Sequence, residues 1–369
     1  MDTLCRLYFL TDTVLGFGAL RELSPAMRAA GISRPFLVAD RGIAAAGLTD
    51  RIVEAMDTPP VATFLDTPAN PTKAACEAAA RAYVENEADG VVAVGGGSPI
   101  DLAKAVLVLA THDGAFESYD AVAGGTALID GTRLPPLIAV PTTAGTGSEV
   151  GQSAVISVPG ERKYILRHPG LKPRTAISDP DLTLSLPRAM TVGSGMDAMT
   201  HCIEGFLSPR PNPPAEAVAL DGLRRIWNHL ERAAADGDDR EARWHLLMGS
   251  AEGGMAMTNG LGAVHAMSHA AGGAARPQSS PRHPQRGLPA QRPAVQHRRE
   301  QCRPDPARRG DRVPRRRSLH RRHRGAQPAA RHPCRHRRDG RHSGPRAVAG
   351  TGGKGGLHGR HQRPPDQRR

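Results

Sequence analysis

The chain has 369 residues, enough for two domains, and a net charge of +13 that is unevenly distributed. Residues 1–275 have a net charge of −9 and residues 276–369 a net charge of +22, so the first part resembles an ordinary, mildly acidic soluble protein. No stretch reaches about 18 apolar residues, which argues against a membrane span. The five cysteines form no C-x-x-C pair, which argues against a disulfide framework and favours a cytoplasmic location.

Three short apolar runs in the first half predict buried strands. They are "RPFLVAD" (34–40), "DGVVAVGGG" (89–97) and "PPLIAVPTT" (135–143), and alanine-rich helical segments lie between them. Continuous apolar runs that alternate with helices are typical of a parallel sheet covered on both faces. We therefore expect an α/β, Rossmann-like domain over residues 1–183.

The second strand is followed by three glycines and a helix. Ser98 is expected to cap this helix, with Asp101 at the spacing of a capping box. Backbone N–H groups at a helix N-terminus that no side chain covers can bind a pyrophosphate. The alternative is a tight turn without a ligand, and the pattern is not G-x-G-x-x-G.

A second polar loop, "PTTAGTGSEV" (141–150), follows the third strand. Its hydroxyl groups would lie at the carboxyl end of a parallel strand, where open α/β sheets bind their ligands. Asp40, at the end of the first run, could accept hydrogen bonds from an adenosine ribose, which would favour NAD over NADP. It could equally cap the next helix.

Helical periodicity dominates residues 184–275, which we expect to form a second, all-helical domain. Two pairs of polar residues here are spaced four apart: Asp197 with His201, and His265 with His269. That spacing puts each pair on one helix face, and a carboxylate with several imidazoles suits Fe(II) or Zn(II). For either pair alone, the alternative is a helix with a polar face; Glu204 could be a solvated neighbour.

Five segments in this order resemble the iron-containing alcohol dehydrogenase family: "GGGSPIDLAK", "PTTAGTGSEV", "ISDPDLTLSLP", "GMDAMTHCIEG" and "GAVHAMSHAAGG". The resemblance implies an NAD(P)-binding domain, a helical domain and a divalent metal between them. It implies metal ligands at Asp197, His201 and His265, and a proton-transfer role for His269 beside the nicotinamide. The cofactor-binding residues that it implies are Asp40, Asn70, Gly96, Gly97, Ser98, Asp101, Thr142, Thr143 and Lys163.

Residues 276–369 depart from this family. They are rich in Arg, Pro and His and have no aromatic residue, so we expect disorder. The family's fourth metal ligand, a histidine roughly a dozen residues past His269, has no counterpart. If the reading frame had slipped by one nucleotide, each codon of the family's sequence would begin with the second base of the codon read here. The second bases of the codons for residues 280–296 are all permitted as first bases for the family's segment. This match suggests a frameshift between about 270 and 277. The alternative is a natural basic tail that binds polyanions.

The resemblance therefore implies hydride transfer between nicotinamide and a small alcohol, aldehyde or ketone whose oxygen the metal polarises. This activity is expected of the intact family form, which we expect to be a homo-oligomer, and the written chain could be inactive. Neither a membrane nor a nucleic acid is expected as a partner. The alternatives are a maleylacetate-reductase-like enzyme, and a nucleotide-binding fragment with a basic tail.

Overall fold

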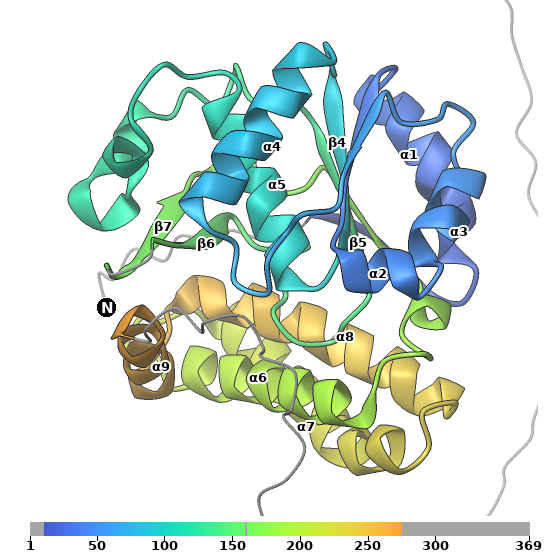
Figure 1. Cartoon of the computed structure of the whole chain (residues 1–369). Coiled ribbons are helices and arrows are strands. Elements are labelled where there is room, and N and C mark those ends of the chain that lie inside the picture. The colour runs from blue at the N-terminus through green and yellow to red at the C-terminus, as the bar shows by residue number, and fades with distance from the viewer. Residues whose placement is uncertain (1–10, 159–160, 275–369) are drawn as a thin grey trace, which may run out of the picture. The chain divides into compact units, whose positions relative to one another are not determined.

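The structure is a computed structural model that describes residues 11–158 and 161–274. Its elements form a sheet with flanking helices, followed along the chain by a group of helices (Figure 1). The basic tail lies outside the described residues, as does the part of the predicted frameshift range, about 270–277, that begins at 275. No helix among the described residues is long and apolar enough to cross a membrane.

A six-stranded, fully parallel sheet organises the first part, in the order β1-β8-β5-β4-β2-β3. Strands β2, β4 and β5 are the three runs predicted from the sequence. Strands β1 and β3 are short and partly exposed, and β8, although buried, has polar residues at both ends of its four-residue run. The bounds are β1 Asp12–Leu15, β2 Pro35–Val38, β3 Ala62–Phe64, β4 Gly90–Gly95, β5 Leu137–Pro141 and β8 Thr175–Ser178.

Both faces of this sheet are covered. Phe36 and Val38 of β2 pack into an apolar cluster with α4 and α5, whereas Leu37 of the same strand packs with α1 and α3. Side chains alternate between the faces of a strand, so a strand buried on both sides reads as a continuous apolar run. The expected α/β class is confirmed. The helices are α1 Leu23–Ala30, α2 Arg41–Ala45, α3 Leu48–Glu54, α4 Lys73–Glu85 and α5 Gly97–Leu109.

An antiparallel hairpin, which the sequence analysis did not predict, joins the sheet region. It consists of β6 Ser153–Ser157 and β7 Lys163–Arg167. The hairpin matters for the site because β7 begins with Lys163, and because β6 packs beside α5.

The second part is helical, as expected. Its helices are α6 Arg188–Phe206, α7 Pro213–Ala235, α8 Arg240–Ala256 and α9 Ala263–Ala274. Apolar side chains of α6, α7 and α8, among them Cys202, Ile226 and Leu246, form a separate core. Glycines allow close approach here: a Cβ at Gly222 of α7 would lie 2.9 Å from the Cys202 sulfur of α6.

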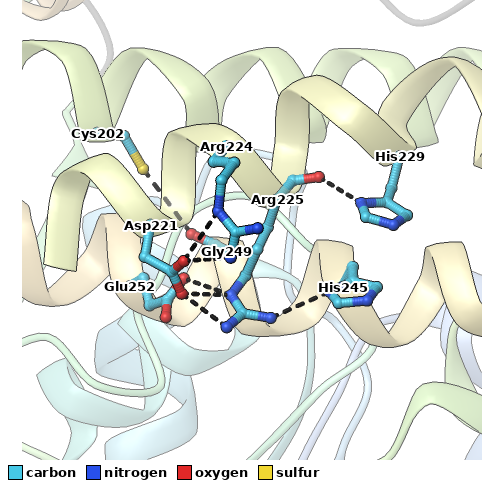
Figure 2. Close-up of polar contacts among 8 residues, drawn as sticks. All are labelled: Cys202, Asp221, Arg224, Arg225, His229, His245, Gly249 and Glu252. Atoms are coloured by element: carbon cyan, nitrogen blue, oxygen red, sulfur yellow. Dashed lines mark hydrogen bonds and ion pairs between the residues drawn. The ribbon is translucent and has the colours of Figure 1, made fainter. Parts of the chain in front are cut away.

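Polar side chains also connect α7 to α8 (Figure 2). Arg225 of α7 binds Asp221 one turn earlier at 2.6 Å, and its Nε lies 3.2 Å from a carboxylate oxygen of Glu252 on α8. Burial raises the pKa of Glu252 to about 7. Both α7 and α8 pack against α6, which carries Asp197 and His201.

Candidate functional site

The glycine-rich turn between β4 and α5 leaves the helix N-terminus open. Gly95 has a φ of 141°, and the N-cap is Gly96, with no hydrogen bond from a capping side chain. The predicted capping box is therefore wrong. Ser98 lies inside the first turn, where its hydroxyl donates to the Ala69 carbonyl at 2.5 Å. No capping side chain in the described part of the chain covers the first N–H groups of α5, as an anion site requires.

The second polar loop lies directly against this turn. A Cβ at Gly97 would lie 2.6 Å from the Thr146 side chain, and one at Gly96 would lie 3.0 Å from the Thr143 hydroxyl. Any larger residue at Gly97 would push the two loops apart. The other side of the loop packs against α8. A Cβ at Gly147 would lie only 2.4 Å from the Gly254 Cα of that helix, so the two backbones approach closely.

A buried ion pair holds the two loops together. The Asp101 carboxylate accepts hydrogen bonds from the Ser148 hydroxyl at 2.6 Å and the Val155 N–H at 2.9 Å. The Lys104 ammonium donates to the Ser148 carbonyl and hydroxyl, both at 2.7 Å, and to the Ser153 carbonyl at 2.9 Å. Burial raises the pKa of Asp101 and lowers the pKa of Lys104. Both Asp101 oxygens are occupied by protein groups, so this carboxylate supports the loop.

Sequence reasoning missed two members of this buried cluster. Lys104 stands among apolar residues of a predicted helix, an unusual place for a lysine that could have indicated a buried ion pair. Glu149 is also buried; one of its oxygens lacks a hydrogen-bond partner among the described residues, and burial raises its pKa to about 7.

The remaining candidate cofactor residues lie near the carboxyl ends of β2, β4 and β5, which are neighbours in the sheet. The Thr142 hydroxyl is buried and has no partner within the described part of the chain. The Lys163 ammonium donates to the Asn70 side-chain oxygen at 3.3 Å. Asp40 caps α2 by accepting a hydrogen bond from the Ile43 N–H at 2.9 Å. Helix capping was one of the two roles that the sequence allowed for Asp40, and ribose binding was the other. The orphaned hydroxyl and the open helix N-terminus fit a bound dinucleotide.

Three predicted metal ligands come together although they stand on different helices. Asp197 and His201 lie one turn apart on α6, and His265 lies on α9. One potential ligand atom of each lies within 4.8 Å of the others, with the His265 Nε2 3.6 Å from an Asp197 oxygen. The His201 Nδ1 lies 3.3 Å from the Gly145 carbonyl, so its Nε2 is left for a ligand. One carboxylate and two imidazoles in this arrangement fit a divalent metal.

Glu204 is not a solvated neighbour, contrary to the interpretation considered from sequence. Its side chain is 7% exposed and accepts a hydrogen bond from the His265 Nδ1 at 2.6 Å. Burial acts to raise its pKa, but hydrogen bonds from Gly262, His265 and Val264 lower the pKa overall. The carboxylate therefore contacts the His265 ring at Nδ1, the nitrogen that does not face Asp197.

His269 lies one turn beyond His265, with ring centroids 6.3 Å apart. Burial, followed by the nearby Lys163 charge, lowers the pKa of His269. Lys163 belongs to the sheet region, so the structure brings candidate cofactor and metal residues to the same place.

A second group of potential ligands lies at α7 and α8: His229, Glu241 and His245. Two guanidinium groups already contact it. Arg225 binds the His245 Nδ1 at 3.1 Å (Figure 2), and Arg232 binds Glu241 at 2.8 Å. Because these cations would repel a metal ion, the first group fits a metal better.

Comparison with known proteins agrees with this arrangement. Residues 11–180 match the iron-containing alcohol dehydrogenase family, and residues 191–276 match the C-terminal part of the Fe-containing alcohol dehydrogenase family. A 4-hydroxybutyrate dehydrogenase of Cupriavidus necator is 50% identical over 267 residues, which cover 72% of this chain and 70% of the relative.

Solved structures also share the fold. Sulfoacetaldehyde reductase from Bifidobacterium kashiwanohense, in complex with NAD+, has a TM-score of 0.65 at 30% identity, over 69% of this chain and 67% of that one. Maleylacetate reductase from a Rhizobium species has a TM-score of 0.62 at 27% identity, over 74% of this chain and 71% of that one. The chain belongs to the iron-containing alcohol dehydrogenase family.

Proposed function

We propose that this chain is an NAD(P)- and metal-dependent alcohol dehydrogenase acting on a small alcohol, aldehyde or ketone. The observation that supports this most directly is that β7, which begins with Lys163, packs beside α9, which carries His265 and His269. When bound, the nicotinamide would accept or supply hydride, and the metal would polarise the alcohol or carbonyl oxygen.

The proposed dinucleotide site uses the open N-terminus of α5. Backbone N–H groups at Gly96, Gly97 and Ser98 would bind the pyrophosphate, because they carry the positive end of the helix dipole. Thr142, whose hydroxyl has no partner among the described residues, and Thr143 would line the site beside them. Asp101 would not contact the cofactor and would instead hold the second loop against this turn.

Three further side chains complete the proposed cofactor site. Lys163 and Asn70, already hydrogen-bonded to each other, would bind the nicotinamide ribose. The second oxygen of Asp40 would accept from the adenosine ribose, which favours NAD over NADP because a 2′-phosphate would meet a like charge. The alternative cofactor is NADP.

Asp197, His201 and His265 would hold Fe(II) or Zn(II); three oxygen and nitrogen ligands do not distinguish these metals. His269 would exchange a proton with the reacting oxygen or with solvent. Its lowered pKa keeps the ring neutral near pH 7, the form able to accept a proton.

For the substrate we propose a 4-hydroxy acid and its semialdehyde, as in the 50% identical relative. The test is to follow NADH oxidation with 4-oxobutanoate in the protein loaded with Fe(II) or Zn(II). His269→Ala is expected to lower the rate about 10²–10⁴-fold, as for loss of an acid–base group. His245→Ala, outside the site, should leave it unchanged.

The maleylacetate-reductase alternative makes the opposite prediction. Turnover of maleylacetate that survives both a chelator and Asp197→Ala would support it and contradict the metal-dependent proposal. Binding of NAD without any turnover would support the nucleotide-binding fragment.

We also propose that residues 276–369 come from a shifted reading frame. The family match ends at residue 276, where the composition becomes rich in arginine, proline and histidine. The gene's nucleotide sequence across codons 268–285 tests this. Early stop codons in the other frame would contradict the frameshift, and activity gained by a frame-restored chain would support it. A cytoplasmic location and homo-oligomerisation of the intact family form stay predictions.

A further inference from the structure

Glu204 occupies a position between the two helices that carry the metal-site residues. It lies on α6, three residues after His201, and points to the start of α9. Its side chain is almost fully buried, and a buried carboxylate must be paired or fully hydrogen-bonded to be tolerated. The groups that satisfy it therefore indicate what it does.

Within the described ranges, the three donors to Glu204 belong to residues 262–265. One oxygen accepts from the Val264 N–H at 2.6 Å, and the other accepts from the Gly262 N–H at 2.8 Å and the His265 Nδ1 at 2.6 Å. The first N–H groups of a helix have no partner within the helix, so this carboxylate caps α9 from another helix. Its negative charge also lies at the favourable end of the α9 dipole.

The approach depends on a glycine. A Cβ at Gly262 would lie 2.9 Å from the Glu204 Oε1, so a side chain there would displace the carboxylate. The chain thus leaves room for Glu204 to reach both the backbone and the imidazole.

The hydrogen bond to His265 also selects one form of the ring. A carboxylate only accepts, so the Nδ1 of His265 must carry a proton, and in the neutral ring the Nε2 then carries the lone pair. That Nε2 is the atom 3.6 Å from Asp197, inside the proposed metal site. Carboxylates and carbonyls that hold a ligating histidine in this way fix its tautomer and orientation.

We propose that Glu204 is the positioning residue of the metal site: it joins α9 to α6 and holds His265 with the Nε2 lone pair toward Asp197 and His201. The inference rests on the proposed metal-binding function of these three residues. It assigns no proton transfer to Glu204.

The deciding experiment reads the His265 tautomer without any metal. Long-range ¹H–¹⁵N NMR of histidine-labelled full-length protein, at a pH where the ring is neutral, distinguishes Nδ1–H from Nε2–H. We expect Nδ1–H in the natural chain, Nε2–H in Glu204→Leu, which has no acceptor, and an intermediate population in Glu204→Gln, which keeps one acceptor oxygen. Nε2–H in the natural chain, or an unchanged tautomer in both variants, would overturn the proposal.

Co(II) binding, followed by its visible absorption spectrum, measures the consequence. Glu204→Gln should weaken Co(II) binding about 10- to 100-fold, as for other partners that orient a ligand. Asn212→Ala is the matched control, because Asn212 is a buried N-cap of α7 that accepts from the Ala215 N–H, away from the metal site.

The two readouts separate the possible failures. If Asn212→Ala weakens Co(II) binding as much as Glu204→Gln does, the effect is loss of helix stability and the positioning role is wrong. If the natural chain binds no Co(II) while the tautomer changes as expected, Glu204 does hold the ring and the proposed metal function fails instead.

Discussion

The sheet region and the helical region bury their side chains to different extents. Strands β2, β4 and β5 are buried along their whole length, and the Asp101–Lys104 pair beside them is enclosed as well. Helices α6 and α9 instead leave large apolar side chains in solvent, with Val264 at 53% and Met267 at 65% exposure. The sheet region is therefore packed on both faces, whereas the start of α9 is joined to α6 by hydrogen bonds to Glu204.

The largest expected effect is the loss of the buried cation. Lys104→Ala removes the charge opposite Asp101 and is expected to lower the free energy of unfolding by about 3–5 kcal/mol, because an uncompensated buried charge remains. Chemical denaturation followed by circular dichroism measures this. Arg28→Ala, which removes the exposed ion pair with Asp57, should cost no more than about 1 kcal/mol. Equal losses in the two variants would refute the contrast.

Apolar truncations compare the two regions directly. Ile138→Ala, in the fully buried β5, is expected to cost about 2–5 kcal/mol because it leaves a cavity. Val264→Ala on α9 removes atoms that are mostly in solvent and should change the stability by less than about 0.5 kcal/mol. The same denaturation curves measure both, and a large loss in Val264→Ala would mean that the helical region is packed as tightly as the sheet.

Glu149 is expected to make the stability depend on pH. Its folded-state pKa of about 7 lies above the ordinary value of 4.5, so between these pH values the folded state binds the proton more tightly than the unfolded state does. The free energy of unfolding therefore falls as the pH rises from 4.5 to 7. Glu149→Gln should therefore stabilise the protein by up to about 3 kcal/mol at pH 8 and hardly at all at pH 4.

Thermal unfolding at both pH values checks the Glu149 prediction. Glu252, whose pKa is also raised to about 7, remains in the variant and contributes the same slope to both proteins. A gain of equal size at pH 4 and pH 8 would show that the substitution acts through packing and not through ionisation.

The smallest effect on stability is expected at the exposed face of α9. Met267→Lys should leave the unfolding midpoint nearly unchanged, within about 0.5 kcal/mol, and should reduce binding of an apolar fluorescent dye. A clear loss of stability would show that Met267 is covered in solution, contrary to its exposure here.

Much of the sheet region could be predicted because its signals are local. The apolar runs of β2, β4 and β5 and the glycines before α5 each report on their own few residues. The capping box failed because Asp101 binds Ser148 and Val155, which lie 47 and 54 residues further along the chain, in place of the N-terminus of its own helix. A capping pattern carries no information about such distant competitors.

The sequence by itself determined the α/β class, the helical second part, and the pairing of Asp197 with His201 one turn apart, since each follows from the period of a single strand or helix. The family resemblance already implied that His265 joins Asp197 and His201, but only the tertiary structure decided that Glu204 is a buried partner of His265 and not a solvated neighbour. The contacts of His265 with Glu204 and with Asp197 join residues 61 and 68 positions apart. They depend on how the helices and loops pack, which no local pattern specifies.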